Sequence, residues 1–194
     1  MCSCPIYCIN LNKRKYVWDK LMINEYNKTL NIQRFEAING MKLDKHHKIT
    51  RGHLGCWMSH HAIWKNINET TIILEDDIVI PDMFLEKVSA ILDDAIDLQY
   101  DIILLGHNYT NNNKKSVSKL LNSMKWKFHG TQGYIITKQG AEKLCKLVEE
   151  DYPGKIDISI SKFGKKGLID ILVVKEKLIK LHKKYKKYSD TVRN

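Results

Sequence analysis

Short apolar runs alternate along the chain with segments whose apolar residues recur every three or four positions. Runs of this kind are typical of buried strands, and they predict strands at residues 4–11, 32–40, 71–76, 101–106, 133–137 and 168–174. The helical spacing predicts helices at residues 16–27, 50–68, 84–96 and 138–150. Strands that alternate with helices predict an α/β sandwich with a mostly parallel central sheet flanked by helices.

The stretch at residues 107–127 is rich in Asn, Lys and Ser. It predicts a polar loop, long enough to act as a lid over a site. No low-complexity spacer divides the chain, so we expect a single domain over residues 1–194, with a basic tail from about residue 175.

Polar segments follow three of the predicted strands, at residues 10–14, 75–77 and 106–108. In sheets of this type, ligands bind beyond the carboxyl ends of the strands. The functional site is therefore expected along this edge of the sheet.

Three consecutive acids, Glu75, Asp76 and Asp77, come directly after the apolar run at 71–74. Neighbouring carboxylates repel one another, and burying one is costly without a cation or hydrogen-bond donors nearby. Two carboxylates at a strand end can hold a hard cation through oxygen, and that cation would clamp a diphosphate. The alternative is an acidic loop compensated by lysines or helix N-termini.

The helix predicted at 50–68 can be capped by Thr50, and its Gly52 and Gly55 permit close backbone approach. A helix N-terminus of this kind suits phosphate. Its histidines are either ligands and bases or core residues packed beside two tryptophans; these residues are His53, His60, His61, Trp57 and Trp64.

Two further features come later in the chain. Gly130 and Gly133 frame a turn before a strand, and Asp157 stands alone among apolar neighbours. Asp157 is either a general base or a helix N-cap.

The formal net charge of +10 favours anionic partners such as nucleic acid, phosphorylated small molecules or an acidic membrane surface. Many lysines lie near the C-terminus, where residues 183–188 read KKYKKY. This segment is either a solvated tail or a tether to anionic membrane. The sequence has five cysteines and no recognisable signal peptide or membrane span, which favours reduced thiols and a cytoplasmic protein with a peripheral membrane contact.

Taken in order, the segments resemble glycosyltransferase family 25, which contains lipooligosaccharide and collagen galactosyltransferases. The resemblance covers roughly residues 5–160 and lies in INLNKR (9–14), FEAING (35–40), GHLGCWMSHHAIW (52–64), IILEDD (72–77), DIILLG (101–106) and GTQGYIITKQGAEKL (130–144). It implies a GT-A type nucleotide-binding sandwich. The implied activity is inverting transfer of galactose or glucose from a UDP-sugar to a glycan or hydroxylated acceptor, with Mn²⁺ or Mg²⁺.

The resemblance also implies roles for single residues. Asp77 would be a metal ligand, and Glu75 or Asp76 would contact metal or ribose. Other expected nucleotide contacts are Asn10, Leu11, Arg14, Gly55, Ser59 and His60. Asp157 would be the base that takes the proton of the acceptor hydroxyl as it attacks the anomeric carbon opposite the leaving UDP.

His182 is a further candidate metal ligand, as in other GT-A enzymes. The chain departs from the family pattern at Asn12, where Asp is frequent, and at His53, where Glu or Gln is common. It also lacks the usual family ending after the last strand.

Two alternative functions remain open. One is a non-catalytic relative that binds nucleotide sugars or glycans. The other is a metal-dependent phosphoryl-transfer enzyme or nuclease, suggested by the acids and the basic charge. Because the basic residues cluster near the C-terminus, away from the expected site, no nucleic-acid partner is expected.

Overall fold

The computed structural model describes residues 4–109, 115–125, 127–149 and 152–182. Its centre is an eight-stranded sheet with the strand order β2-β1-β3-β8-β5-β9-β7-β6. The strands of this sheet are β1 Ile6–Asn10, β2 Gln33–Glu36, β3 Thr71–Glu75, β5 Ile102–Tyr109, β6 Lys115–Ser116, β7 Leu121–Ser123, β8 Phe128–Ile136 and β9 Ile171–Val174. A separate two-stranded sheet pairs β4, Ile78–Val79, with β10, Lys180–Leu181.

The predicted α/β sandwich with a mostly parallel sheet is confirmed. Strands β2, β1, β3, β5 and β9 run in one direction, and β8 and β7 run in the other. The helices are α1 Lys15–Leu21, α2 Glu25–Thr29, α3 Arg51–Trp64, α4 Phe84–Asp94, α5 Lys138–Leu147 and α6 Ile156–Lys165, and short 3-10 turns occupy Asn12–Arg14 and Gly40–Lys42.

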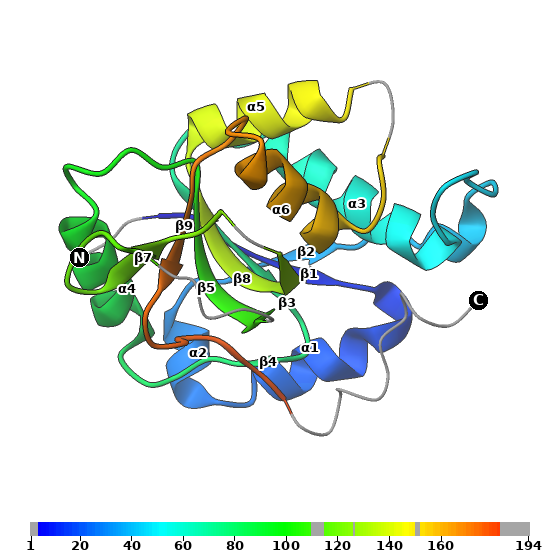
Figure 1. Ribbon diagram of the computed structural model, residues 1–194. Coiled ribbons are helices and arrows are strands. Elements are labelled where there is room, and N and C mark those ends of the chain that lie inside the picture. The colour runs from blue at the N-terminus through cyan, green and yellow to red at the C-terminus, as the bar shows by residue number, and fades with distance from the viewer. Residues whose placement is uncertain (1–3, 110–114, 126, 150–151, 183–194) are drawn as a thin grey trace.

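Helices cover both faces of the sheet, with α3, α5 and α6 on one side and α1, α2 and α4 on the other (Figure 1). Successive residues of a strand point to opposite faces, so Ile73 packs with Trp57 of α3 while Ile72 and Leu74 pack with Phe84 of α4. This burial on both faces explains the continuous apolar runs seen in the sequence.

Several element boundaries differ from the sequence-based expectations. The single helix expected at 16–27 is divided into α1 and α2, because the Asn24 side chain accepts a hydrogen bond from the Tyr26 N–H and starts a second helix. A helix, α6, occupies 156–165, where the sequence indicated a helix only through the N-cap alternative for Asp157.

The prediction of a polar loop at 107–127 is wrong for most of the described residues in that range. Strand β5 continues to Tyr109, and β6 and β7 form a hairpin that extends the sheet beyond β9. The cause is apolar burial within a polar stretch, since Leu121 and Met124 are both buried in the core. Residues 110–114 and 126 lie outside the described residues.

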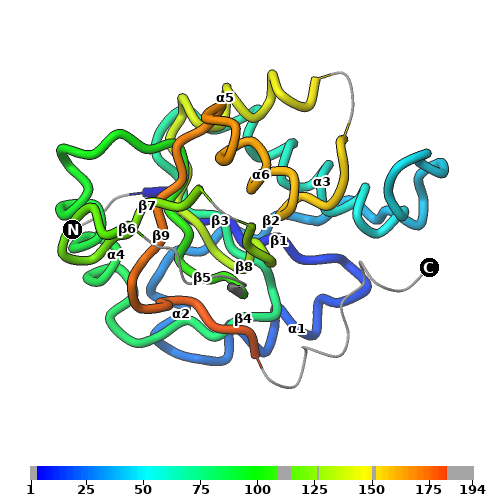
Figure 2. The backbone as a smooth tube through the Cα atoms, in the orientation of Figure 1, coloured from blue at the N-terminus to red at the C-terminus, as the bar shows by residue number. Residues whose placement is uncertain are grey.

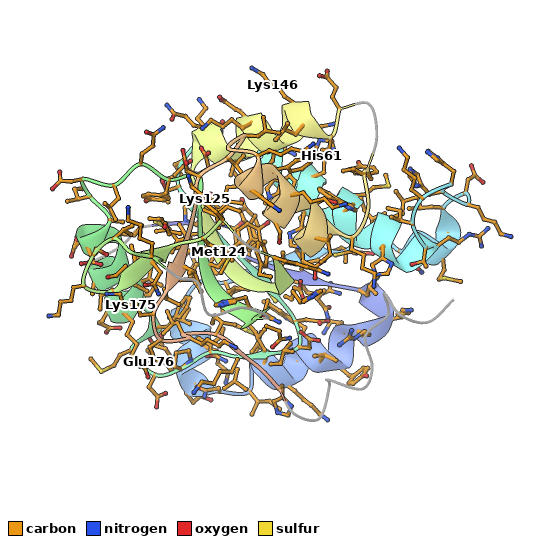
Figure 3. All side chains as sticks on the ribbon, viewed as in Figure 1. His61, Met124, Lys125, Lys146, Lys175 and Glu176 are labelled. Atoms are coloured by element: carbon orange, nitrogen blue, oxygen red, sulfur yellow. The ribbon has the colours of Figure 1, made fainter. Side chains whose placement is uncertain are left out.

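The segment expected to begin a basic tail is folded as far as residue 182. After β9 the chain turns at Lys175 and Glu176, which lie exposed at the outer edge of the molecule (Figure 3). It then returns along the side of the sheet that carries α1 and α2, beside β4 (Figure 2). The lysine-rich residues 183–188 lie outside the described residues. Among the described residues, no helix combines the length and the apolar character needed to cross a bilayer.

Candidate active site

A pocket opens where the carboxyl ends of β1 and β3 meet the N-terminal half of α3, at the edge of the sheet that the sequence indicated. Its walls come from four segments, after β1, after β2, along α3 and after β3. Of the residues expected to bind the nucleotide or metal, those that line it are Leu11, Arg14, Gly55, Ser59, His60, Glu75, Asp76 and Asp77.

Backbone-to-backbone packing of α3 on the segment 38–40 forms one wall of the pocket. A Cβ atom on Gly55 would lie 2.6 Å from the Gly40 nitrogen and 2.6 Å from the Ile38 oxygen. The Ser59 hydroxyl donates to the Gly55 carbonyl (2.6 Å) and accepts from the Ile38 N–H (2.9 Å). Gly55 and Ser59 therefore shape the wall as well as line it.

The start of α3 agrees with the expected cap. Thr50 Oγ1 accepts a hydrogen bond from the His53 N–H (3.3 Å), and His53 Nδ1 lies 2.6 Å from the same hydroxyl. Asn12 also departs from the family pattern, and its Oδ1 accepts a hydrogen bond from Arg34 Nη2 (3.2 Å).

Protein groups compensate the charge of Asp76. Asn10 Nδ2 donates to Asp76 Oδ2 (2.6 Å), and Arg14 Nη2 lies 3.3 Å from Asp76 Oδ1. Asn10 is itself held by Arg34, whose Nε donates to Asn10 Oδ1 (2.8 Å). Asn10 is buried and does not line the pocket, so it acts on the site through Asp76.

The ionised forms of Glu75 and Asp77 are compensated less well by the chain, and both pKa values are raised. Burial, together with the charge of Asp77, raises the pKa of Glu75 to about 8, against a hydrogen bond of 2.7 Å from Thr131 Oγ1. Burial, together with the charge of Asp76, raises the pKa of Asp77 to about 6. Asp77 Oδ1 is buried and finds no hydrogen-bond partner among the described residues.

The carboxylates of Glu75 and Asp77 therefore lack compensating positive charge, which a bound cation would supply. Carboxylate oxygen is the donor that hard cations such as Mn²⁺ and Mg²⁺ prefer, and the orphaned oxygen of Asp77 fits such an ion. Within the described ranges, no three or more His, Cys, Asp or Glu side chains are grouped to hold a metal by themselves. A cation here would need further ligands from water or from a bound diphosphate.

His60 belongs both to the pocket wall and to the core. Its Nδ1 lies 2.8 Å from the Tyr134 hydroxyl, which also accepts a hydrogen bond from Trp64 Nε1 (2.9 Å). Burial lowers the pKa of His60 to about 3, so the ring is neutral at physiological pH. His61 points away from the pocket toward the α5 side (Figure 3), where it hydrogen-bonds the Tyr152 hydroxyl at 2.9 Å.

Asp157 lies in the first turn of α6 and outside the lining of the pocket. The N-cap position of α6 is Lys155, so the capping alternative for Asp157 is wrong. Its Oδ2 accepts from the Gly130 N–H (2.9 Å) and its Oδ1 from the Ile158 N–H (2.8 Å). Its charge is close enough to contribute to the raised pKa of Glu75.

Sequence reasoning missed two groups that organise the site, Thr131 and Arg34, which hold Glu75 and Asn10 respectively. It expected His182 as a metal ligand, and the structure brings this residue to Asp77 through its backbone, where the His182 N–H donates to the Asp77 carbonyl (2.7 Å). Thr131 and Arg34 lie inside segments that the sequence singled out, and nothing in the pattern distinguished them. The approach of His182 to Asp77 was indicated by the family resemblance and not by periodicity, because the two positions are far apart in the sequence.

Comparisons with known proteins bear on this pocket. A sequence model of glycosyltransferase family 25 (LPS biosynthesis protein) matches residues 3–160. Procollagen galactosyltransferase 2 of Homo sapiens is 26% identical over 167 residues, which cover 72% of this chain and 27% of that protein. The inactive glycosyltransferase 25 family member 3 of Mus musculus is 22% identical over 166 residues, 72% of this chain and 28% of its own.

The chain thus spans less than a third of the length of these curated relatives. Among solved structures, a UDP-glucose pyrophosphorylase complexed with UDP-glucose aligns with a TM-score of 0.46 and 13% identity, over 87% of this chain and 72% of that one.

Proposed function

Because the chain belongs to glycosyltransferase family 25, we propose that it is an inverting glycosyltransferase that moves galactose or glucose from a UDP-sugar to a glycan or hydroxylated acceptor. A divalent cation, Mn²⁺ or Mg²⁺, assists the reaction. The observation that carries the proposal is the pair of undercompensated carboxylates, Glu75 and Asp77, in the pocket at the end of β3.

Asp77 is the principal residue that would hold the cation, and Glu75 stands beside it. When bound, the ion supplies positive charge that stabilises the diphosphate of the leaving UDP. Arg14 and Lys13 line the same pocket, and their charges suit the remaining phosphate oxygens. The Gly55, Ser59 and His60 wall faces the nucleotide, where the neutral imidazole adds no competing charge.

Attack by the acceptor hydroxyl needs a base, and the carboxylate of that base must be held in a fixed orientation. In the proposed step the acceptor oxygen forms a bond to the anomeric carbon, the bond to UDP breaks, and the hydroxyl proton passes to Asp157. The backbone N–H groups of Gly130 and Ile158 fix the Asp157 carboxylate on the β8 side of the site.

UDP release from UDP-galactose and UDP-glucose, with and without Mn²⁺, tests the proposal. Asp77→Asn should lower kcat by on the order of 100-fold or more, because it weakens binding of the cation whose positive charge stabilises the leaving UDP. Asp19→Asn is the matched control, since Asp19 is an exposed acid on α1 that forms a surface salt bridge with Lys15. Equal turnover of the two variants would contradict the proposal.

A second candidate function is binding of a nucleotide sugar or glycan without transfer. Both carboxylate oxygens of Asp157 already accept backbone hydrogen bonds, which favours a structural role for this residue. UDP-sugar binding by wild-type protein that never turns over with any glycan or peptide acceptor would support this function. Cleavage of plasmid DNA that disappears in Asp77→Asn would instead support the phosphoryl-transfer alternative.

A further inference from the structure

The chain that follows β9 returns to the acidic residues through a short segment, residues 178–182, which we term the C-terminal strap. The Leu178 and Ile179 N–H groups both donate to the Leu105 carbonyl at 3.0 Å. The strap then forms β10, which pairs antiparallel with β4, so that Lys180 lies opposite Val79 and Leu181 opposite Ile78. It reaches Asp77 through the His182 N–H, 2.7 Å from the Asp77 carbonyl.

Two glycines leave the space in which the strap lies. Gly106 of β5 and Gly133 of β8 are register partners in the sheet. A Cβ atom on Gly106 would lie 2.5 Å from the Ile179 carbonyl oxygen, and one on Gly133 would lie 3.0 Å from Ile179 Cγ1. Ile179 is 1% exposed. Because the Gly106 contact is with backbone, no side-chain rotation can relieve it, and any larger residue there must displace the strap.

Among the described residues, the strap lies beside the part of the acidic segment, Asp76 and Asp77, that belongs to no strand. Strand β3 ends at Glu75, and Asp76 and Asp77 form a bend before β4. The only β-ladder partner of β4 among the described residues is β10 of the strap. The backbone at Asp77 is therefore held by the hydrogen bond from the His182 N–H and by the pairing of β4 with β10 that follows it.

We propose that the C-terminal strap, seated by Gly106 and Gly133, is a positioning device for Asp77 and sets the affinity of the pocket for a divalent cation. The proposal rests on the proposed function in one respect, namely that Asp77 holds the cation. It assigns the positioning to the backbone of the strap and not to the imidazole of His182. It also explains why glycine stands both at the end of DIILLG (Gly106) and within GTQGY (Gly133).

A pair of substitutions at one position separates backbone from side chain. His182→Pro removes the N–H that donates to the Asp77 carbonyl. Leu181 already lies in a strand, which is the conformation that a residue before proline favours. His182→Ala keeps the N–H. Mn²⁺ affinity, measured from the electron paramagnetic resonance signal of free Mn²⁺, should fall about tenfold in His182→Pro. It should stay within about twofold in His182→Ala.

Displacing the strap from its far end gives an independent variant. Gly106→Ala should also lower Mn²⁺ affinity, and combining it with His182→Pro should give less than the product of the two effects, because both act through one segment. Gly164→Ala is the matched control: its Cβ would lie 2.6 Å from Ile171 Cδ1, the movable end of a side chain on α6's side of the sheet. Each variant is measured well below its own Tm.

Hydrogen exchange gives a readout that needs no metal. The amide of Val79, which lies opposite Lys180 in the hydrogen-bonded pair next to His182 and Asp77, should exchange faster in His182→Pro and Gly106→Ala than in the wild type or Gly164→Ala. Unchanged exchange and Mn²⁺ affinity in His182→Pro would overturn the proposal, and so would an equal loss in His182→Ala. If wild-type protein binds no Mn²⁺, the cation assignment and the proposed setting of its affinity both fail, and hydrogen exchange then decides whether the strap still orders Asp77.

Discussion

At the scale of single residues, the site divides its negative charge into a compensated and an uncompensated part. Asp76 accepts a hydrogen bond from Asn10 and pairs with the charge of Arg14, whereas the pKa values of Glu75 and Asp77 are raised. The sequence placed the acids correctly at a strand end, but it could not say which of them the protein would pair. That depends on Asn10 and Arg14, which reach the acids only once β1 and β3 lie side by side.

His60 makes a separate prediction at this scale. Its folded pKa, about 3, lies below its ordinary value of 6.5, so the unfolded chain binds the proton first. The contribution of His60 to stability is therefore complete above about pH 6.5 and is lost as the pH falls toward 3. The slope of the free energy of unfolding against pH that His60 contributes approaches about 1.4 kcal/mol per pH unit.

Urea unfolding at pH 7 and pH 5 measures this slope in the wild type and in His60→Gln. The variant should lose less stability between the two values, because Gln has no proton to gain. Subtracting the variant from the wild type removes the titration of the other groups. Identical differences in the two proteins would contradict a buried, neutral His60.

At the scale of elements, the sequence predicted those with strong local signals. The α3 helix with its Thr50 cap and the buried β3 run are confirmed. The hairpin of β6 and β7 was missed because its polar composition outweighed two buried residues. No helix was predicted over α6, because residues 156–161, IDISIS, alternate apolar and polar positions as a strand does.

The missed hairpin can be tested through its core residue. Leu121→Ala should lower the free energy of unfolding by about 2–5 kcal/mol, because Leu121 is fully buried and its loss leaves a cavity. Leu168→Ala is the matched control, since Leu168 is 44% exposed and should cost much less. Urea unfolding of both variants checks the difference. Comparable small losses would contradict the burial of residue 121 and favour a solvated loop.

At the scale of the whole molecule, the net charge of +10 is unevenly distributed along the chain. Four lysines, Lys183, Lys184, Lys186 and Lys187, follow the strap within a few positions. If they contact anionic membrane, each contributes about 1 kcal/mol of attraction at low salt. This contact stays a prediction, since these residues lie outside the described part of the chain.

Sedimentation with anionic vesicles tests the membrane contact. Replacing the four lysines with Gln should abolish salt-sensitive binding. Replacing Lys146, Lys162, Lys165 and Lys166 of the α5 and α6 side with Gln gives the same net charge and should preserve most of it. Equal losses in both variants would show that only the total charge matters.

The strap also bears on the order in which the site can form during synthesis. The acidic residues are synthesised before the strap, together with the walls made by β1 and α3, whereas the backbone that orients Asp77 follows about 100 residues later. During that interval a nascent chain carries its carboxylates without the segment that aims them. Capture of a cation or a nucleotide is deferred until the polypeptide has been made through residue 182.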